Sequence, residues 1–342
     1  MGGNQVDKVS HYARLTSAEI ANLWSQYIND SMAGCVIRYS LEKVEDKDIR
    51  NILEFALQLS TSHLEKIKEF LSQEKYPLPI GFTEADVNLE APPLFSDLFM
   101  LFYMYVMTLH GLTGYAGAIG TSIRADQRSY FIQCNTDTMK LYDMVMNVMV
   151  EKGVISRPPN INAPVQVDFV SKQNFLTGWF GDRRPLNAIE VSGIYFNMQK
   201  TIAKIVLEIG FSQVAQSKEV RDYIKRGEKI CDGQHETLNS LLLESNLPAP
   251  RKWDSEVTNS TIPPFSDKLL LFHIVTLVAT ASGYYGAAFA LSQRRDLGLK
   301  YELLITEITK YAEDGANLLI KNGWLEQPPT FVDREKLGKQ KD

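Results

Sequence analysis

The residues best suited to metal chemistry in this chain are its five histidines, at positions 11, 63, 110, 235 and 273, and the carboxylates near them. A di-metal site in a helical bundle requires a glutamate from each of two helices and a Glu-x-x-His pair from each of the other two. The nearest approach to that pair is Asp232-Gly233-Gln234-His235. A similar place earlier in the chain reads Ser60-Thr61-Ser62-His63, which contains no carboxylate. The complete ligand set is therefore missing.

The candidate metal ligands that remain are His235, His273 and Asp232. Zinc and iron normally take at least three protein ligands, so these residues predict at most a degenerate metal site. The alternative is that the histidines on apolar helix faces are buried and neutral, each with one hydrogen-bond partner. We expect no other cofactor.

The chain contains no other recognisable catalytic motif. It has no Gly-rich phosphate loop after a strand, no HExxH and no GxSxG, and none of its three cysteines lies in a recognisable context with a histidine. The sequence therefore favours a non-catalytic role, and the question of enzymatic activity stays open.

Composition narrows the class of protein and its partners. The chain has 342 residues, a formal net charge of −5 and 23% charged residues, and its mean hydropathy is −0.17. These values are typical of a soluble globular protein, and the absence of a basic surface argues against nucleic-acid binding. Three well-separated cysteines and an N-terminus without an apolar signal segment predict a cytoplasmic location. A protein partner is possible, and the oligomeric state cannot be predicted.

The helices that must position these residues belong to a sequence unit that occurs twice in the chain. The stretch at 92–97, PPLFSD, returns as PPFSD at 263–267, and GYAGA at 114–118 returns as GYYGA at 283–287. The separation is about 170 residues throughout, with slips of one. Such self-similarity predicts two copies of one structural unit.

In each unit, apolar residues at helical spacing predict four amphipathic helices, which we refer to as A to D. Helix A begins with a capping-box spacing, Thr16 with Glu19 or Asn187 with Glu190, and helix C begins at Ser96 or Ser266. Helix D ends at Gly153 or Gly323. The connection between helices B and C is long enough to cross the bundle, as in ferritin-like folds. We therefore predict an all-α protein with two tandem ferritin-like four-helix bundles.

This prediction sets the domain boundaries. The first bundle covers residues 1–160, an aromatic linker covers 161–186, the second bundle covers 187–331 and a polar tail covers 332–342. The linker is too aromatic for a flexible tether, and we expect Phe169, Phe175, Trp179 and Phe180 to pack on the bundles. Asp182, Arg183 and Arg184 would anchor the start of the second helix A; a partner-docking surface is the alternative.

One helix has the composition of a membrane span. Residues 98–123 contain no Asp, Glu, Lys or Arg. If this segment crossed a bilayer, each repeat would lose one of its four helices, so we expect a core helix and no membrane span. Its glycines, as in Gly114 and Gly117, suggest a face on which a neighbouring backbone packs closely, with a ligand gap as the alternative.

These motifs resemble the bacterial "domain of unknown function 3231" family, which occurs largely in endospore-forming bacteria. The resemblance rests on the doubled organisation, the PP-x-FSD and GY-x-GA patterns and FLTGWFGDRRPLN in the linker. It implies a ferritin-like fold, no established activity, and a sporulation or stress context by association. The leading hypothesis is a structural or interaction protein. The alternative is a metal- or small-molecule-binding bundle with a redox or storage function, which would require inward-facing polar groups that converge.

Overall fold

The computed structural model describes residues 13–179 and 183–339. Residues 1–12, 180–182 and 340–342, and with them the expectations for His11, Phe180 and Asp182, lie outside this part. The described residues form an all-α protein in two tandem halves, which confirms the predicted fold class. The helices of the first half are α1 (Ser17–Lys43), α2 (Lys47–Gln73), α3 (Asp97–Thr121) and α4 (Ala125–Glu151). Those of the second half are α5 (Ala188–Val214), α6 (Lys218–Glu244), α7 (Asp267–Leu291), α8 (Arg295–Lys321) and the short α9 (Arg334–Lys339).

The helix ends lie where local side chains satisfy the free backbone groups. Thr16 and Asn187 form capping boxes with Glu19 and Glu190 at the starts of α1 and α5. Ser96 and Ser266 accept hydrogen bonds from the first turns of α3 and α7. Gly153 and Gly323 follow α4 and α8 with φ of 66° and 69°, the left-handed conformation that glycine adopts without strain. The predicted caps are confirmed.

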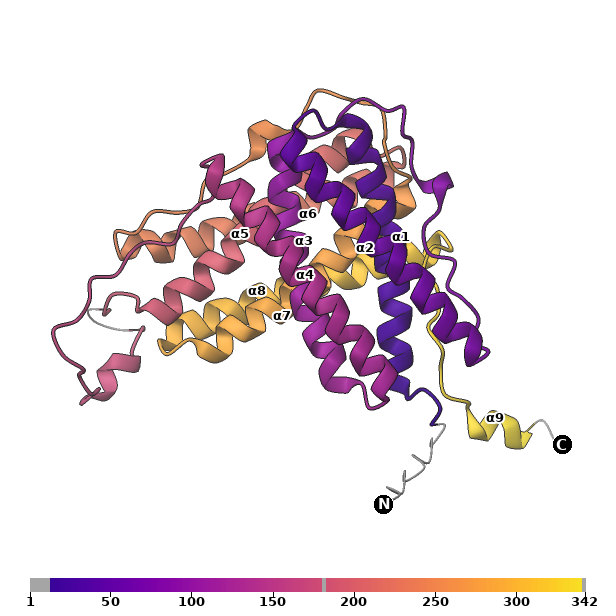
Figure 1. Ribbon diagram of the computed structural model, residues 1–342. Coiled ribbons are helices and arrows are strands. Elements are labelled where there is room, and N and C mark those ends of the chain that lie inside the picture. The colour runs from indigo at the N-terminus through magenta and orange to yellow at the C-terminus, as the bar shows by residue number, and fades with distance from the viewer. Residues whose placement is uncertain (1–12, 180–182, 340–342) are drawn as a thin grey trace, which may run out of the picture.

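Each half is built from two helical hairpins. In the first half α1 packs on α2 and α3 packs on α4, and in the second half α5 packs on α6 and α7 on α8. The hairpins of each half pack on one another, and α3 also contacts α5 across the halves. Figure 1 shows the helices of the second half running across those of the first. The ferritin-like class of these halves stays a prediction.

The long connections between the hairpins cross from one repeat to the other. The Ser96 hydroxyl at the start of α3 donates a 2.6 Å hydrogen bond to Glu256 of the second repeat. Reciprocally, the Ser266 hydroxyl at the start of α7 donates a 2.7 Å bond to Asp86 of the first. Two isolated β-bridges, Val87 with Phe265 and Phe95 with Val257, repeat the same exchange. The contacts are equivalent in both directions, as in an interface of two-fold symmetry.

Aromatic rings extend this exchange into the core. Trp253 stacks on Phe102 of the other repeat, with ring centroids 4.9 Å apart and planes within 6°. The equivalent pair is Phe82 with Phe272, at 5.2 Å. One hydrophobic cluster contains residues from both repeats. The two repeats therefore share a core.

In each half, a buried glutamate connects the two hairpins at the end of the helices away from Ser96 or Ser266. Glu19 accepts hydrogen bonds from the backbone N–H groups of Thr16, Ile123 and Arg124, at 2.8–2.9 Å. Glu190 does the same for Asn187 and Arg294 and also binds Arg184. Burial raises the pKa of each carboxyl, but these hydrogen bonds outweigh it and hold the pKa below its usual value.

Replacing Glu19 with glutamine should destabilise the protein by about 1–3 kcal/mol at pH 7, because one amide N–H2 would face a backbone donor. A lowered carboxyl pKa contributes stability that is present above about pH 4.5 and is lost as pH falls through the folded-state pKa. The difference between wild type and variant should therefore shrink below pH 4.5 in urea titrations at several pH values. Glu190→Gln is the matched variant in the second repeat. A difference that does not change with pH would contradict this role.

The apolar α3 is a core helix over its first half. Residues 99–106 of α3 are all buried. One helix of the described chain, α7, is long and apolar enough by composition to cross a membrane, and 33% of its most apolar window is buried. The expected close packing at the glycines is wrong: nothing lies within 4 Å of a Cβ placed at Gly114, Gly117, Gly283 or Gly286. In the first repeat, Gly114 and Gly117 are exposed.

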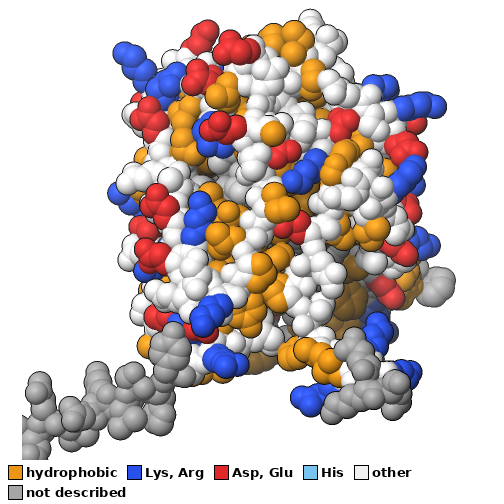
Figure 2. All heavy atoms as spheres, turned by 90° about the vertical axis from the view of Figure 1, so that its right-hand side faces the viewer, with side chains coloured by type: hydrophobic (Ala, Val, Ile, Leu, Met, Phe, Trp, Pro, Cys, Tyr) orange, Lys and Arg blue, Asp and Glu red, His pale blue; other side chains and the backbone are white. Residues whose placement is uncertain are grey.

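The linker packs only in part. Phe169 is 93% exposed, so the expectation that it packs on a bundle is wrong. Arg184 stacks over the Phe175 ring at 4.0 Å and binds Glu190 on α5, as expected of an anchor for that helix. On the face shown in Figure 2, acidic and basic side chains are interspersed with small hydrophobic areas.

Candidate functional site

Three polar side chains converge inside the first repeat from three different helices. Asp30 lies on α1, His63 on α2 and Tyr115 on α3. The Nδ1 atom of His63 lies 3.2 Å from Asp30 Oδ2, and the Tyr115 hydroxyl lies 3.4 Å from the same Nδ1. Gln26 donates to the Tyr115 hydroxyl at 3.3 Å and accepts from Tyr130 at 3.1 Å. We call Asp30, His63 and Tyr115 the acid–base cluster.

The acid–base cluster contains a buried ion pair. The side chains of His63 and Asp30 are 8% and 12% exposed. Burial lowers the pKa of His63, but the hydrogen bonds to Asp30 and Cys134 and the charge of Asp30 outweigh burial and raise that pKa to about 10. His63 is therefore a cation at neutral pH, held against the Asp30 carboxylate. The pair as a whole carries no net charge.

The acid–base cluster forms part of the wall of a cavity of about 460 Å³. All four helices of the first repeat line it, and α7 of the second repeat covers one side. The surface of the lining is mostly apolar, from residues such as Met104 and Leu141, and many polar side chains, such as Gln26, His110 and Thr280, also line it. Ligand sites in proteins have this size and combine an apolar surface with polar groups.

The second repeat has hydrogen-bonding residues at the three positions of the acid–base cluster, but they carry no charge. The bounds of α1 and α5, and of α2 and α6, differ by 171 residues, so Thr201 stands where Asp30 does and Gln234 where His63 does. Tyr285 takes the place of Tyr115, and its hydroxyl lies 3.2 Å from Thr201 Oγ1 and 3.0 Å from Gln234 Oε1. The sequence comparison that set His63 against His235 is therefore off by one residue. The connection after α6 is one residue shorter than that after α2, so an alignment of the two repeats with the offset of the later helices misplaces α6 by one residue.

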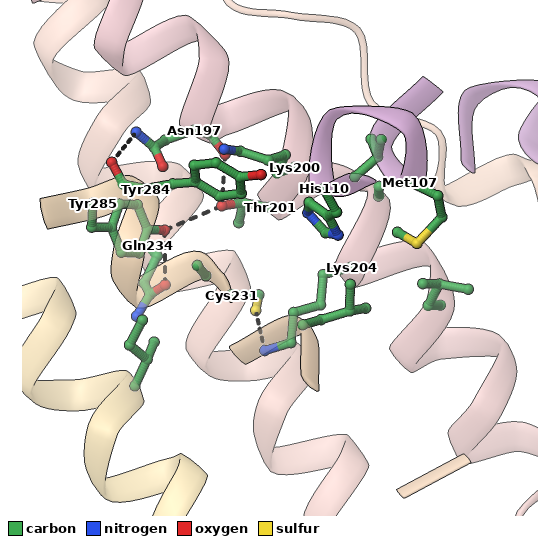
Figure 3. Close-up of a pocket in the computed structure, with 16 residues that line it drawn as sticks. Met107, His110, Asn197, Lys200, Thr201, Lys204, Cys231, Gln234, Tyr284 and Tyr285 are labelled. Atoms are coloured by element: carbon green, nitrogen blue, oxygen red, sulfur yellow. Dashed lines mark hydrogen bonds between the residues drawn. The ribbon is translucent and has the colours of Figure 1, made fainter. Parts of the chain in front are cut away.

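The corresponding cavity of the second repeat is almost filled. Its volume is about 30 Å³; Lys200 of α5 lies beside Thr201, and Lys204 lies beside Cys231 (Figure 3). The two repeats thus differ in two ways. The first has a large cavity beside a charged pair, whereas the second has an almost filled cavity beside neutral residues.

The residues expected to bind a metal do not come together. Asp232 lies 3.5 Å from Lys252, whereas His273 is buried and its Nε2 lies 3.3 Å from the Tyr103 hydroxyl of the first repeat. His235 is buried, and its Nε2 has no hydrogen-bond partner among the described residues. Burial lowers the pKa of both histidines, that of His273 to about 4, so they are neutral at pH 7. In the described part of the chain no group of three or more His, Cys, Asp or Glu side chains could hold a metal ion.

Sequence reasoning missed Asp30 and Tyr115. Asp30 stands between apolar positions of α1, such as Tyr27 and Met32, which are both buried. A carboxylate on the buried side of an amphipathic helix needs a partner, and that was the available signal. Tyr115 belongs to the repeated GY-x-GA pattern; Tyr115 and Gly114 both line the cavity, whereas Gly117 does not.

These features define an all-α protein of two repeats with a ligand-sized cavity in the first. The family model "Protein of unknown function (DUF3231)" matches residues 4–167 and again residues 174–337. The chain therefore belongs to this family, and it contains two copies of the family unit, which confirms the resemblance inferred from the motifs.

Other comparisons add little about function. No curated protein matches the chain. Among solved structures, it is similar to a candidate spore coat protein of Bacillus halodurans, at 20% identity over 44% of this chain and 98% of that chain, with a TM-score of 0.41. A likeness at this level carries no argument about what the present chain does.

Proposed function

We propose that this protein binds a small, mainly apolar molecule in the cavity of its first repeat. The observation that carries the proposal is the contrast between the repeats: about 460 Å³ beside a buried ion pair in one, and about 30 Å³ beside neutral counterparts in the other. A duplicated unit that served packing alone would have no need of the larger cavity or the buried charges, which are costly to bury.

The chemistry of the lining describes the ligand. The ion pair of the acid–base cluster is neutral overall, and burial holds the pKa of His110 at about 3 and that of His273 at about 4, so neither is charged at pH 7. An uncharged ligand with an apolar body and one oxygen that accepts or donates a hydrogen bond fits this lining. The proposal requires no metal ion, and the ion pair could supply at most two side chains to coordinate one.

A structural or interaction role is the second candidate, and the association with sporulation or stress implied by the family resemblance belongs to it. Its support is a run of exposed apolar residues between the repeats, which consists of Ile161, Val165, Val167, Phe169 and Val170. The cytoplasm remains the proposed location, and the three buried free cysteines agree with a reducing compartment. Affinity purification from sporulating cells with and without this run would test the role.

Filling the cavity should weaken the binding of a probe. Gly114 lines the cavity, and open space surrounds the position of a Cβ there, so Gly114→Trp would place an indole in it. We expect the affinity for Nile red, an uncharged apolar dye with a carbonyl oxygen, to fall at least tenfold, about 1.4 kcal/mol. Fluorescence titration measures the change.

Gly117→Trp is the matched control. Gly117 lies one turn further along α3, is equally open, and does not line the cavity. Its dye affinity should stay close to that of the wild type. Equal loss in both variants, or no saturable binding by the wild type, would contradict the proposed function.

A further inference from the structure

The large cavity of the first repeat reaches the surface along a polar face of α1. Asn22, Ser25, Gln26 and Asn29 stand at the spacing i, i+3, i+4 and i+7, so they lie on one face of this helix, and all four line the cavity. Ser25 is exposed, and Asn22 and Asn29 are half-buried. We call Asn22, Ser25 and Asn29 the polar rim. The outer end of a ligand in the cavity would lie beside these three side chains.

The lining changes from polar to apolar between the polar rim and the interior. Met104, Leu141 and Leu277 line the cavity and are all buried. Among the described residues that line it, only Asp30 and His63 are charged at neutral pH, and they are paired with each other. The lining therefore suits an amphiphile whose apolar end lies inside and whose uncharged polar end meets the polar rim.

Hydrogen bonds fix the orientation of both amides of the polar rim. Asn29 donates from Nδ2 to the backbone carbonyl of Ser25 at 2.9 Å, and a carbonyl can only accept. Asn22 donates from Nδ2 to the Thr121 hydroxyl at 3.0 Å. That hydroxyl already uses its single hydrogen on carbonyl oxygens of its own helix, so it too can only accept. Each amide therefore keeps its Oδ1 atom, an acceptor, free of partners among the described residues.

Two threonines of α7 add to the same capacity. Thr276 and Thr280 line the cavity, and their hydroxyls donate to the backbone carbonyls of Phe272 and Thr276 at 2.9 Å. Each hydroxyl oxygen can then only accept a further hydrogen bond. The uncharged polar groups of the lining thus offer mainly acceptors, and a ligand that matches them must bring hydrogen-bond donors.

We propose that the ligand is a single-chain amphiphile whose uncharged polar end carries hydroxyl groups, as in a monoacylglycerol. The inference rests on the proposed function of the cavity and names the chemical class of its ligand. A volume of about 460 Å³ is toward the lower end for ligand sites, which favours one alkyl chain over two. The hydroxyls would donate to Oδ1 of Asn22 and Asn29 and exchange hydrogen bonds with Ser25.

Charged polar ends fit the lining less well. A carboxylate or a phosphate brings only acceptors, and in the described part of the chain no lysine or arginine lines the cavity to pair with it. An ammonium group brings donors, but it would need a carboxylate, and Asp30 is already paired with His63. Hydroxyl groups supply the donors without a charge.

Displacement of Nile red tests this inference on the intact chain. Four amphiphiles with the same alkyl chain are compared below the concentrations at which they form micelles: 1-decanoylglycerol, methyl decanoate, decanoate and decylammonium. We expect 1-decanoylglycerol to bind about tenfold more tightly than methyl decanoate, which has no donor, because its two hydroxyls form hydrogen bonds that the methyl ester cannot. Both charged amphiphiles should bind more weakly than 1-decanoylglycerol.

Asn29→Ala removes one acceptor of the polar rim. It should lower the affinity for 1-decanoylglycerol about three- to tenfold, the usual effect of one hydrogen bond. The affinities for methyl decanoate and for Nile red, neither of which has a donor, should stay close to those of the wild type. Asn51→Ala is the matched control, because Asn51 is an exposed asparagine of α2 that does not line the cavity. Circular dichroism shows whether both variants fold.

The outcomes separate this inference from the proposed function. If Nile red binds saturably but methyl decanoate matches 1-decanoylglycerol, or if decanoate or decylammonium binds more tightly than it, the hydroxylated ligand is ruled out and the proposed function stands. An equal loss for 1-decanoylglycerol and methyl decanoate in Asn29→Ala would also overturn the inference. If the wild type shows no saturable binding of the dye, the proposed function fails, and the inference fails with it.

Discussion

Replacing Asp30 with threonine should lower the free energy of unfolding by about 3–5 kcal/mol at pH 7, the cost of removing one partner of a buried ion pair. His63 would remain buried without its carboxylate, and the largest cause that raises its pKa would be lost. Urea titration of the wild type and the variant measures the loss.

Adding His63→Gln to Asp30→Thr should restore most of this loss. The double variant carries the set that the second repeat already uses, in which Thr201 and Gln234 bond to the hydroxyl of Tyr285. Thr201→Val is the control for a neutral hydrogen bond and should cost about 1–2 kcal/mol. If the double variant were as unstable as Asp30→Thr alone, the charge of the unpaired histidine would not be the cause.

The pH dependence of this pair has a definite sign. Because the pKa of His63 is raised above 6.5 in the folded state, its stabilising contribution is full below pH 6.5 and is lost as pH rises through the folded-state value. In the double variant, this loss at alkaline pH should be absent. The same double variant also shows whether the ion pair matters for dye binding, since the cavity stays open.

The parts of the fold that the sequence predicted are those set by local chemistry. A threonine with a glutamate three residues later defines a helix start within one turn, and so Thr16 with Glu19 could be read directly. Gly153 likewise marks a helix end because its φ of 66° suits glycine. The two-fold repetition followed from direct comparison of the two halves of the chain.

The candidate site could not be found in this way. Asp30 and His63 are 33 residues apart, and Tyr115 is a further 52 away. Only the packing of three helices brings them together, and no local pattern encodes which faces meet. The one-residue difference in the connection after α6 explains why the sequence comparison paired His63 with His235, whose true counterpart is Leu64. The contacts that the connecting segments make with the other repeat could not be predicted from the sequence, because they join residues about 170 positions apart.

These contacts lead to the second prediction of large effect. Replacing Trp253 with alanine should destabilise the whole protein by about 3–5 kcal/mol, as is usual for a fully buried tryptophan. Trp253 is 1% exposed and stacks on Phe102 of the other repeat. The loss should therefore appear in both repeats, and unfolding should remain one transition when followed by urea titration.

Phe82→Ala is the matched variant, because Phe82 occupies the equivalent position and meets Phe272 of the second repeat. It should lower the stability of the same single transition, although Trp253 loses the larger ring. Hydrogen exchange can assign protection separately to α1–α4 and to α5–α8. If Trp253→Ala split the transition and lowered protection in the second repeat alone, the repeats would be independent domains. A common loss is expected, because each repeat binds the cap serines of the other and fills part of its core.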